Sequence, residues 1–451
     1  MNPSRQGFCH RIALLLWLPI SLHPQTPGQQ LSLSECIRRA LTSHPDLLLT
    51  RAQVAAASAE LTAAFGSYLP SVSLSAGYSR QLNVEGGRSI NVGGQIIRLP
   101  SVEPNTYSLS LIGSYVLFDG FGREGNLQRA QAAVKSAEAQ LAYTRQRIAT
   151  EVIRQYTEVL KAEKLLFLRQ RHYEVGKQEL ERVRAFVEVG RQPRSALLAQ
   201  EAELARREVA LLQAQQQYEL AAARLRSFIG VSPTEQARFA DPTIPDSLSP
   251  EEARRLRHQW GSFAALLQQA LTQRQDYIAA QQRVTAISAA LTSARSGYFP
   301  TLLATGGWSW ANSALRDFSQ LGRSFISLQL NVPLFENFRT HAQIQAAELQ
   351  LQQAQAELEK LRQTVTLEVQ TALLNLDALL GQLEAAFRSL QAAEDYAESL
   401  RQRYEVGTAT QTEYLAAEAQ RVEAATTLVT LSYDYYAALA QLRLAVGSGE
   451  P

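Results

Sequence analysis

The chain has 451 residues and a formal net charge of +2, from 44 lysine and arginine residues against 42 aspartate and glutamate residues. Because the positive and negative charges are nearly equal in number, the sequence predicts no basic surface for nucleic acid, and we expect no nucleic-acid partner. The six histidines are scattered without ligand spacing, and the chain has no glycine-rich phosphate loop or nucleophile elbow, so we expect no catalytic site, metal site or cofactor.

The N-terminus has the layout of a secretory signal. A basic flank over residues 5–11 precedes a short apolar run over residues 12–20, and polar residues follow. This order predicts a signal peptide over about residues 1–25, with its cleavage site open because no clear small-x-small motif follows. Cys9 would leave with the signal, and Cys36 would remain without an intramolecular disulfide partner. After the signal, no apolar run reaches the length of about 18 residues that a transmembrane helix needs.

Four short stretches show the two-residue period of amphipathic strands. Apolar side chains alternate with small polar ones over about residues 71–81 and 107–118, and again over about residues 301–310 and 325–335. Each stretch has about ten residues, the length of a tilted transmembrane strand with one face in lipid and the other in water. The segment between the first two strands, residues 83–104, is predicted to form a long extracellular loop.

Each pair of strands is followed by a long stretch without proline. Residues 122–189 and 339–406 keep apolar or alanine side chains at helical spacing, and a continuous helix of this length would extend about 100 Å. Second helical runs follow over residues 195–229 and 412–446. Each half of the chain is therefore predicted to contain a helical hairpin that turns at a glycine, the residue that most readily takes the positive φ of a helix end.

The two halves follow one pattern. Gly190 and Gly407 are related by an offset of 217 residues, the difference between their numbers, and the same offset relates residues 117–121 to residues 334–338. A repeat this long indicates a duplicated half rather than a short-unit solenoid. We divide the chain into the signal peptide, a first repeat over residues 31–230, a linking segment over residues 231–258 and a second repeat over residues 259–449.

Four strands are too few to form a membrane barrel alone. An open strand edge cannot remain unpaired in lipid, and the smallest outer-membrane barrels have about eight strands. Copies of the chain must therefore share one barrel, and three copies would supply twelve strands. The predicted fold class is an α+β membrane protein with long helical hairpins. A soluble sandwich with one polar face is the alternative for the strands alone, and the absence of any other predicted sheet weighs against it.

Short motifs frame each pair of strands. Tyr68-Leu69-Pro70 and Tyr298-Phe299-Pro300 precede the first strand, and Leu117-Phe118-Asp119 and Leu334-Phe335-Glu336 follow the second. With the duplicated hairpins, this ordered set resembles the TolC-like outer-membrane efflux proteins over residues 31–449. The resemblance implies a homotrimer with a twelve-stranded β-barrel in outer-membrane lipid. It also implies a periplasmic α-barrel, with residues 231–258 in a collar around it.

The resemblance also implies a function. Such a protein is the channel-tunnel of a tripartite efflux or type I secretion system, passively conducting cargo handed over by an inner-membrane pump of the RND or ABC type and a periplasmic adaptor. The pump would select the cargo. In the family the hairpin tips meet the adaptor, and the equivalent residues here are Val189, Gly190, Arg191, Val406, Gly407 and Thr408.

Acidic rings narrow the periplasmic aperture in this family. Glu413 stands where one such acid falls, whereas Ala416 occupies the position of a second acid and Ala196 stands at the equivalent of Glu413 in the first repeat. The chain would then offer one ring of carboxylates, which would attract cations and repel one another when ionised. The alternative for Glu413 is an ordinary solvated residue near a helix end.

A periplasmic adaptor-like protein or a coiled-coil scaffold is the alternative function. Such proteins share the long helices rich in alanine, glutamine and glutamate. They do not carry duplicated pairs of amphipathic strands, which favours the outer-membrane channel.

Overall fold

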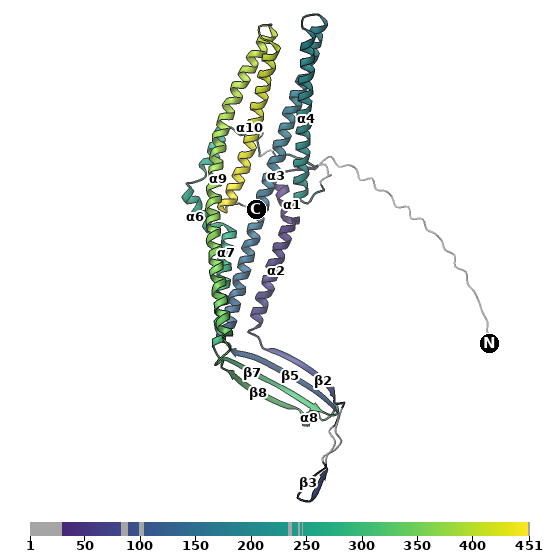
Figure 1. Ribbon diagram of the computed structural model, residues 1–451, viewed down its shortest axis with the longest axis vertical. Coiled ribbons are helices and arrows are strands. Elements are labelled where there is room, and N and C mark those ends of the chain that lie inside the picture. The colour runs from purple at the N-terminus through teal and green to yellow at the C-terminus, as the bar shows by residue number, and fades with distance from the viewer. Residues whose placement is uncertain are drawn as a thin grey trace, which may run out of the picture.

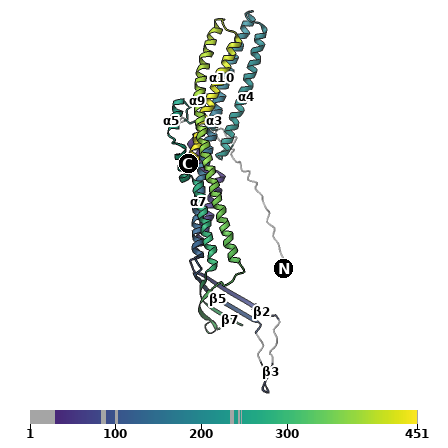
Figure 2. The ribbon, with the colours of Figure 1, turned by 60° about the vertical axis from the view of Figure 1, so that its left-hand side comes forward.

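The computed structural model describes residues 29–82, 89–98, 103–232, 237–241, 244–245 and 247–449. The predicted signal peptide lies outside these residues, as do parts of the expected extracellular loop and of the linking segment. Long helices form an extended body, and a β-sheet projects from one end of it (Figure 1). The view in Figure 2 shows the same separation of helices and sheet.

Two helical hairpins make up most of the body. The first contains α3 (Gly122–Glu188) and α4 (Arg194–Phe228), and the second contains α9 (Arg339–Glu405) and α10 (Gln411–Val446). Both α3 and α9 have 67 residues, and at 1.5 Å per residue each extends about 100 Å. Each of these helices is therefore much longer than the diameter of an ordinary globular domain.

Shorter helices pack beside the long ones. They are α1 (Leu33–Ser43), α2 (Pro45–Gly66), α5 (Pro250–His258), α6 (Phe263–Gln273), α7 (Gln275–Arg295), the 3-10 turn η1 (Ser296–Tyr298) and α8 (Phe318–Leu321). Helices α2 and α7 run along the half of α3 and α9 that lies nearest the sheet (Figure 1). Pro45 and Pro250 stand in the first helical turn of α2 and α5, where a missing N–H costs no hydrogen bond.

The main sheet has four antiparallel strands in the order β2, β5, β7, β8. They are β2 (Ser71–Arg80), β5 (Asn105–Phe118), β7 (Thr301–Asn312) and β8 (Arg323–Asn331). Strands β5 and β7 pair over most of their lengths, so the sheet joins the two repeats. The predicted end of the last strand at residue 335 is wrong, because β8 ends at Asn331. Pro333 follows, and proline has no N–H to donate to a neighbouring strand.

Pairing gives the sheet two distinct faces. Hydroxyls of Ser71 and Ser114 lie 2.7 Å apart, and those of Ser75 and Ser110 lie 2.8 Å apart, on one face. The register places most of the large apolar side chains on the other face, namely Val72, Leu74, Tyr78, Leu109, Leu111, Trp308, Trp310, Ile326, Leu328 and Leu330. Ile112, Val116, Leu303 and Phe325 lie on the face of the serines.

Two further sheets correct the expectation that the chain has no other strands. Strand β1 (Gln29–Leu31) pairs in parallel with β6 (Ala237–Phe239), and β3 (Ser89–Val92) pairs with β4 (Gln95–Arg98). The first pair attaches the start of the described chain to the linking segment. The second lies within the expected extracellular loop, beyond the end of the main sheet (Figure 1).

The body has two main apolar cores. One joins α1 to α3 and α4, where the buried Tyr156 donates a hydrogen bond to the Leu31 carbonyl over 3.0 Å. The other joins α5 and α6 to α9 and α10, where Tyr435 donates to the Ala253 carbonyl over 2.8 Å. Arg254 and Arg257 of α5 pair with Glu384 and Asp377 of α9. None of the helices described is both long and apolar enough to span a membrane.

Candidate functional site at the hairpin tips

The two hairpins turn through the same backbone motif. Gly190 has a φ of +71° and Gly407 a φ of +79°. The N–H of Arg191 donates to the Phe186 carbonyl over 2.8 Å, and the N–H of Thr408 donates to the Arg403 carbonyl over 2.8 Å. These are the Schellman bonds that satisfy the last carbonyls of a helix. The repeat is thus retained in the backbone of the tips.

The tip residues project into open space. A Cβ added to Gly190 or Gly407 would meet no atom within 4 Å. Val189 is 67% exposed and Val406 is 74% exposed. Arg191 and Thr408 are exposed as well. Each tip therefore offers a small apolar and polar surface that another molecule could reach.

Glu413 has a local partner at the start of α10. Its carboxylate accepts hydrogen bonds of 2.8 Å from the backbone N–H and from the hydroxyl of Thr410, forming a capping box. These two bonds hold the pKa of Glu413 below its usual value, so the side chain is ionised at neutral pH. The equivalent helix α4 starts after Pro193 and has no side-chain cap. Capping alone therefore accounts for an acid at 413 and none at Ala196.

The two hairpins touch just behind their tips. Gln411 of α10 donates a 3.0 Å hydrogen bond to Gln200 of α4, which is fully buried. The rings of Tyr404 and Tyr414 stack with their centroids 5.3 Å apart and an interplanar angle of 3°. A cavity of about 550 Å³ lies here, lined among others by Phe186, Arg191, Tyr404 and Thr410. The tyrosine pair holds α9 to α10 within the second hairpin, whereas movement of one hairpin against the other would have to break the Gln411–Gln200 bond.

Two buried ionic side chains, Arg207 and Glu179, lie in the first hairpin. Arg207 is 4% exposed and donates to the His172 carbonyl over 3.1 Å, while its Nε pairs with Glu203. Glu179 is 6% exposed and pairs with Arg182 over 3.0 Å. Burial raises the pKa of Glu179 and lowers that of His172 to about 4. The pairing with Arg182 opposes the effect on Glu179, and burial is the larger influence.

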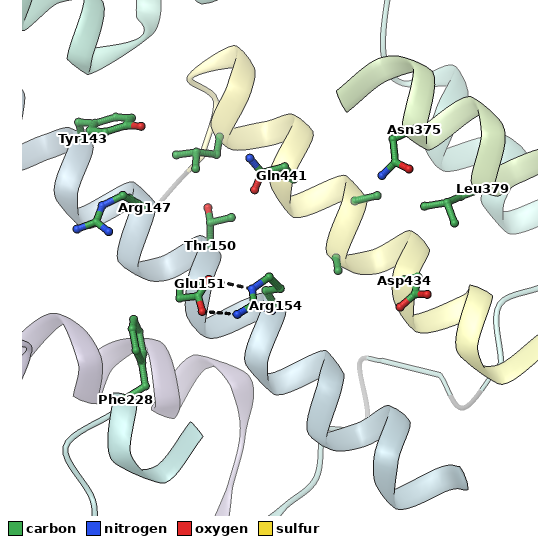
Figure 3. A pocket seen from close by; sticks show the side chains of 13 residues that line it. Tyr143, Arg147, Thr150, Glu151, Arg154, Phe228, Asn375, Leu379, Asp434 and Gln441 are labelled. Carbon is green, nitrogen blue, oxygen red and sulfur yellow. Dashed lines mark hydrogen bonds and ion pairs between the residues drawn. The ribbon is translucent and has the colours of Figure 1, made fainter. Parts of the chain in front are cut away.

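A second cavity lies half-way along the body. It has a volume of about 830 Å³ and is bounded by α3, α9 and α10 (Figure 3). Arg154 and Glu151 pair along its α3 wall, over 2.6 Å between Arg154 Nη2 and Glu151 Oε1, and Asp434 lies on its α10 wall. Asp434 in turn accepts from Lys161 over 3.1 Å. The described ionic groups of this cavity are thus paired with each other or with neighbouring side chains, and they do not converge on a common point as ligand-binding groups would.

The described residues contain no group of three or more histidine, cysteine, aspartate or glutamate side chains that could hold a metal ion. Sequence reasoning placed the tips but missed Gln200, Gln411, Tyr404 and Tyr414. One signal was available, because the first repeat has Arg194, Val187 and Leu197 at the equivalents of Gln411, Tyr404 and Tyr414. Departures from the repeat mark this contact.

Comparison with known proteins decides the family. The profile described as outer membrane efflux protein matches residues 36–231 and 266–448. The chain belongs to the outer membrane efflux protein family. It is 30% identical over 431 residues to the protein CyaE of Bordetella pertussis, covering 93% of this chain and 86% of that protein. It is 26% identical to the outer membrane protein TolC of Vibrio cholerae, covering 92% and 91%.

Solved structures of outer-membrane proteins share the fold. The outer membrane protein VceC of Vibrio cholerae superposes with a TM-score of 0.77 at 21% identity, covering 92% of this chain and 96% of that one. The CmeC outer membrane channel of Campylobacter jejuni gives a TM-score of 0.74 at 20% identity, covering 92% and 86%. The predicted resemblance is confirmed, and so is the location in the outer membrane. These findings disfavour an adaptor-like scaffold, because this chain has the four-stranded sheet and matches the outer membrane efflux protein family.

Proposed function

We propose that the chain is the outer-membrane channel-tunnel of a tripartite efflux or type I secretion system, working as a homotrimer. The sheet carries this proposal. It has an apolar face and a face lined with serine, and within the described chain its edge strands β2 and β8 each pair on one side only. Lipid requires those edges to be paired. If β2 of each copy paired with β8 of the next, three copies would close a barrel of twelve strands, with the serine face of each sheet turned to the inside.

The helical body supports the second part of the proposal. Hairpins of about 100 Å carried by three chains would continue the barrel as a periplasmic tube. The exposed tips around Gly190 and Gly407 would meet a periplasmic adaptor, which couples the tube to an inner-membrane pump of the RND or ABC type. The Glu413 carboxylates of three chains would form one acidic ring at the periplasmic aperture. The channel itself would be passive, without catalytic chemistry.

Native mass and conductance test this function together. The detergent-solubilised mature protein should have the mass of three chains and should form ion-conducting channels in planar bilayers. A monomer or a dimer that does not conduct would overturn the proposal. Resistance of the cell-membrane fraction to extraction with salt and carbonate separates the channel from an adaptor-like scaffold, which would be released.

A further inference from the structure

The segment between β7 and β8, residues 313–322, folds back over the sheet instead of extending away from it. Phe318 of α8 stacks on Trp310 with the ring centroids 4.2 Å apart. Trp310 is only 2% exposed as a result. The backbone of Gly322 packs so closely against Trp308 that a Cβ added to this glycine would lie 2.5 Å from the indole nitrogen. A side chain at 322 would therefore separate the segment from the sheet.

The covered tryptophans lie on the apolar face. Trp310 pairs with Leu109 of β5, and Trp308 pairs with Leu111. Directly paired residues of antiparallel strands share a face. The helix α8 lies at the end of the sheet farthest from the helical body (Figure 1). In the proposed channel, this place is the outer rim of the lipid-facing surface.

The segment has a fixed shape. Asp317 adopts a φ of +59°, and its carbonyl accepts from the Leu321 N–H over 2.9 Å. The side chain of Asn312 donates to the Arg316 carbonyl over 3.2 Å. These bonds, together with the stacking on Trp310, set the direction in which the segment presents its side chains.

The segment exposes three large apolar side chains among polar ones. Leu315 is 68% exposed, Phe318 is 42% exposed and Leu321 is 44% exposed. Arg316 stands beside them at 75% side-chain exposure, where a guanidinium can remain at the level of lipid headgroups while its stem lies along apolar surface. This surface is continuous with the apolar face of the sheet. Three exposed large apolar side chains in ten residues would be costly in water.

We propose that residues 313–322 form a lipid-binding clip that inserts Leu315, Phe318 and Leu321 among the acyl chains of the outer leaflet. The occupant follows from continuity with the apolar face, and the inference therefore rests on the proposed function, in which that face meets lipid. A short amphipathic element at the membrane surface binds in proportion to its buried apolar area. The clip would extend the lipid contact of the barrel beyond β7 and β8.

Site-directed fluorescence tests the clip in the mature protein, from which Cys9 has been removed with the predicted signal peptide. Cys36, the single cysteine of the described residues, is replaced by alanine, and an environment-sensitive fluorophore is attached at Leu321→Cys. Matched variants carry the fluorophore at Leu328→Cys on the apolar face and at Ser327→Cys on the opposite face. Each is reconstituted in phosphatidylcholine vesicles with ordinary or with brominated acyl chains.

We expect brominated lipid to quench most of the emission from positions 321 and 328 and little of that from position 327. Quenching at 328 without quenching at 321 would overturn the clip and leave the proposed function standing. The absence of quenching at both positions would overturn the proposed function itself. A blue-shifted emission at 321 that brominated lipid does not quench would place a second protein surface there, and would also overturn the clip.

Discussion

Gln411 on α10 and Gln200 on α4 join the two hairpins of one chain by a hydrogen bond of 3.0 Å. Gln200 is fully buried, and its amide nitrogen also lies 3.5 Å from the Gly176 carbonyl of α3. The bond therefore links α10 to both helices of the first hairpin. It lies close behind the turns that we propose to face the adaptor, so it resists separation of the hairpins at that end.

Gln411→Ala should weaken this connection. A hydrogen bond of this kind stabilises by about 1 kcal/mol, which corresponds to about a fivefold change in the balance between joined and separated hairpins. We expect a larger or more frequently open conductance in planar bilayers. Gln420→Ala, on an exposed position of the same helix, is the control. Equal conductance in the two variants would show that the Gln200 contact does not restrain the aperture.

Glu413→Gln should change ion selectivity while preserving the helix. Glutamine can still accept from Thr410, so the cap remains and only the charge is removed. We expect a reduced cation preference, measured as a shift of the reversal potential in a salt gradient. Ala196→Glu should act in the opposite direction, since it adds an acid at the equivalent position. If neither variant alters the reversal potential, Glu413 serves the helix end alone.

The pH dependence of the same residue has a definite sign. The pKa of Glu413 lies below its usual value of 4.5, so the charge and its contribution to the cap are complete above that value. Both are lost as the pH falls through the lowered pKa. The wild-type cation preference should therefore be constant from neutral pH down to about pH 5 and decline only below it. A decline near neutral pH would contradict this assignment.

Gly190→Pro and Gly407→Pro should impair export without preventing membrane insertion. Proline cannot adopt a φ of +71° or +79°, and it lacks the N–H that Gly407 donates to the Tyr404 carbonyl over 3.0 Å. The exposed turn would be distorted while the distant sheet stays unchanged. Export by cells and crosslinking to the adaptor measure the loss, and carbonate resistance measures insertion.

Gly407→Asn is the matched control for the tips. Asparagine tolerates positive φ better than other side chains, and open space surrounds the Cβ position. We expect nearly normal export from this variant. Normal export from both proline variants would instead remove the tips from the proposed adaptor contact.

Helical spacing and the repeat were enough to predict the two hairpins. Apolar and alanine side chains recur at helical spacing in both stretches, and α3 and α9 each run without interruption for 67 residues. The strands were also found from alternation, except that Val332 and Leu334 continue the alternation beyond the true end of β8 at Asn331. Alternation describes the faces of an extended chain and says nothing of where pairing stops.

Other features depend on contacts between segments far apart in the chain, and the local spacing of apolar residues does not indicate such contacts. Strands β1 and β6 have three residues each and lie far apart in sequence, so neither shows an alternation that could be recognised. The bond between Gln200 and Gln411 requires two hairpins to meet side by side. The cover of Phe318 over Trp310 requires a loop to fold back on the sheet. These contacts come from tertiary packing, so a departure from the repeat can mark a position such as Gln411 without naming the residue that it meets.

Arg274→Gln should destabilise the second repeat more than any exposed ion-pair variant. Arg274 is 3% exposed at the start of α7, donates to Asp276 over 2.8 Å and to the Ala445 carbonyl over 3.3 Å, and pairs with Glu368. Its equivalent in the first repeat is His44, whose ring packs on Phe228 instead. Removing the guanidinium leaves the largely buried Asp276 carboxylate without its cation, which costs about 3–5 kcal/mol.

Arg283→Gln is the control for Arg274, because it removes an arginine from the same helix. Arg283 pairs with Glu357, but both side chains are exposed, at 64% and 61%. Such a pair contributes at most about 1 kcal/mol. The thermal midpoint of the solubilised protein should therefore fall clearly for Arg274→Gln and hardly at all for Arg283→Gln. Equal midpoints would mean that Arg274 does not hold α7 against α9 and α10, and that apolar packing alone fixes this junction.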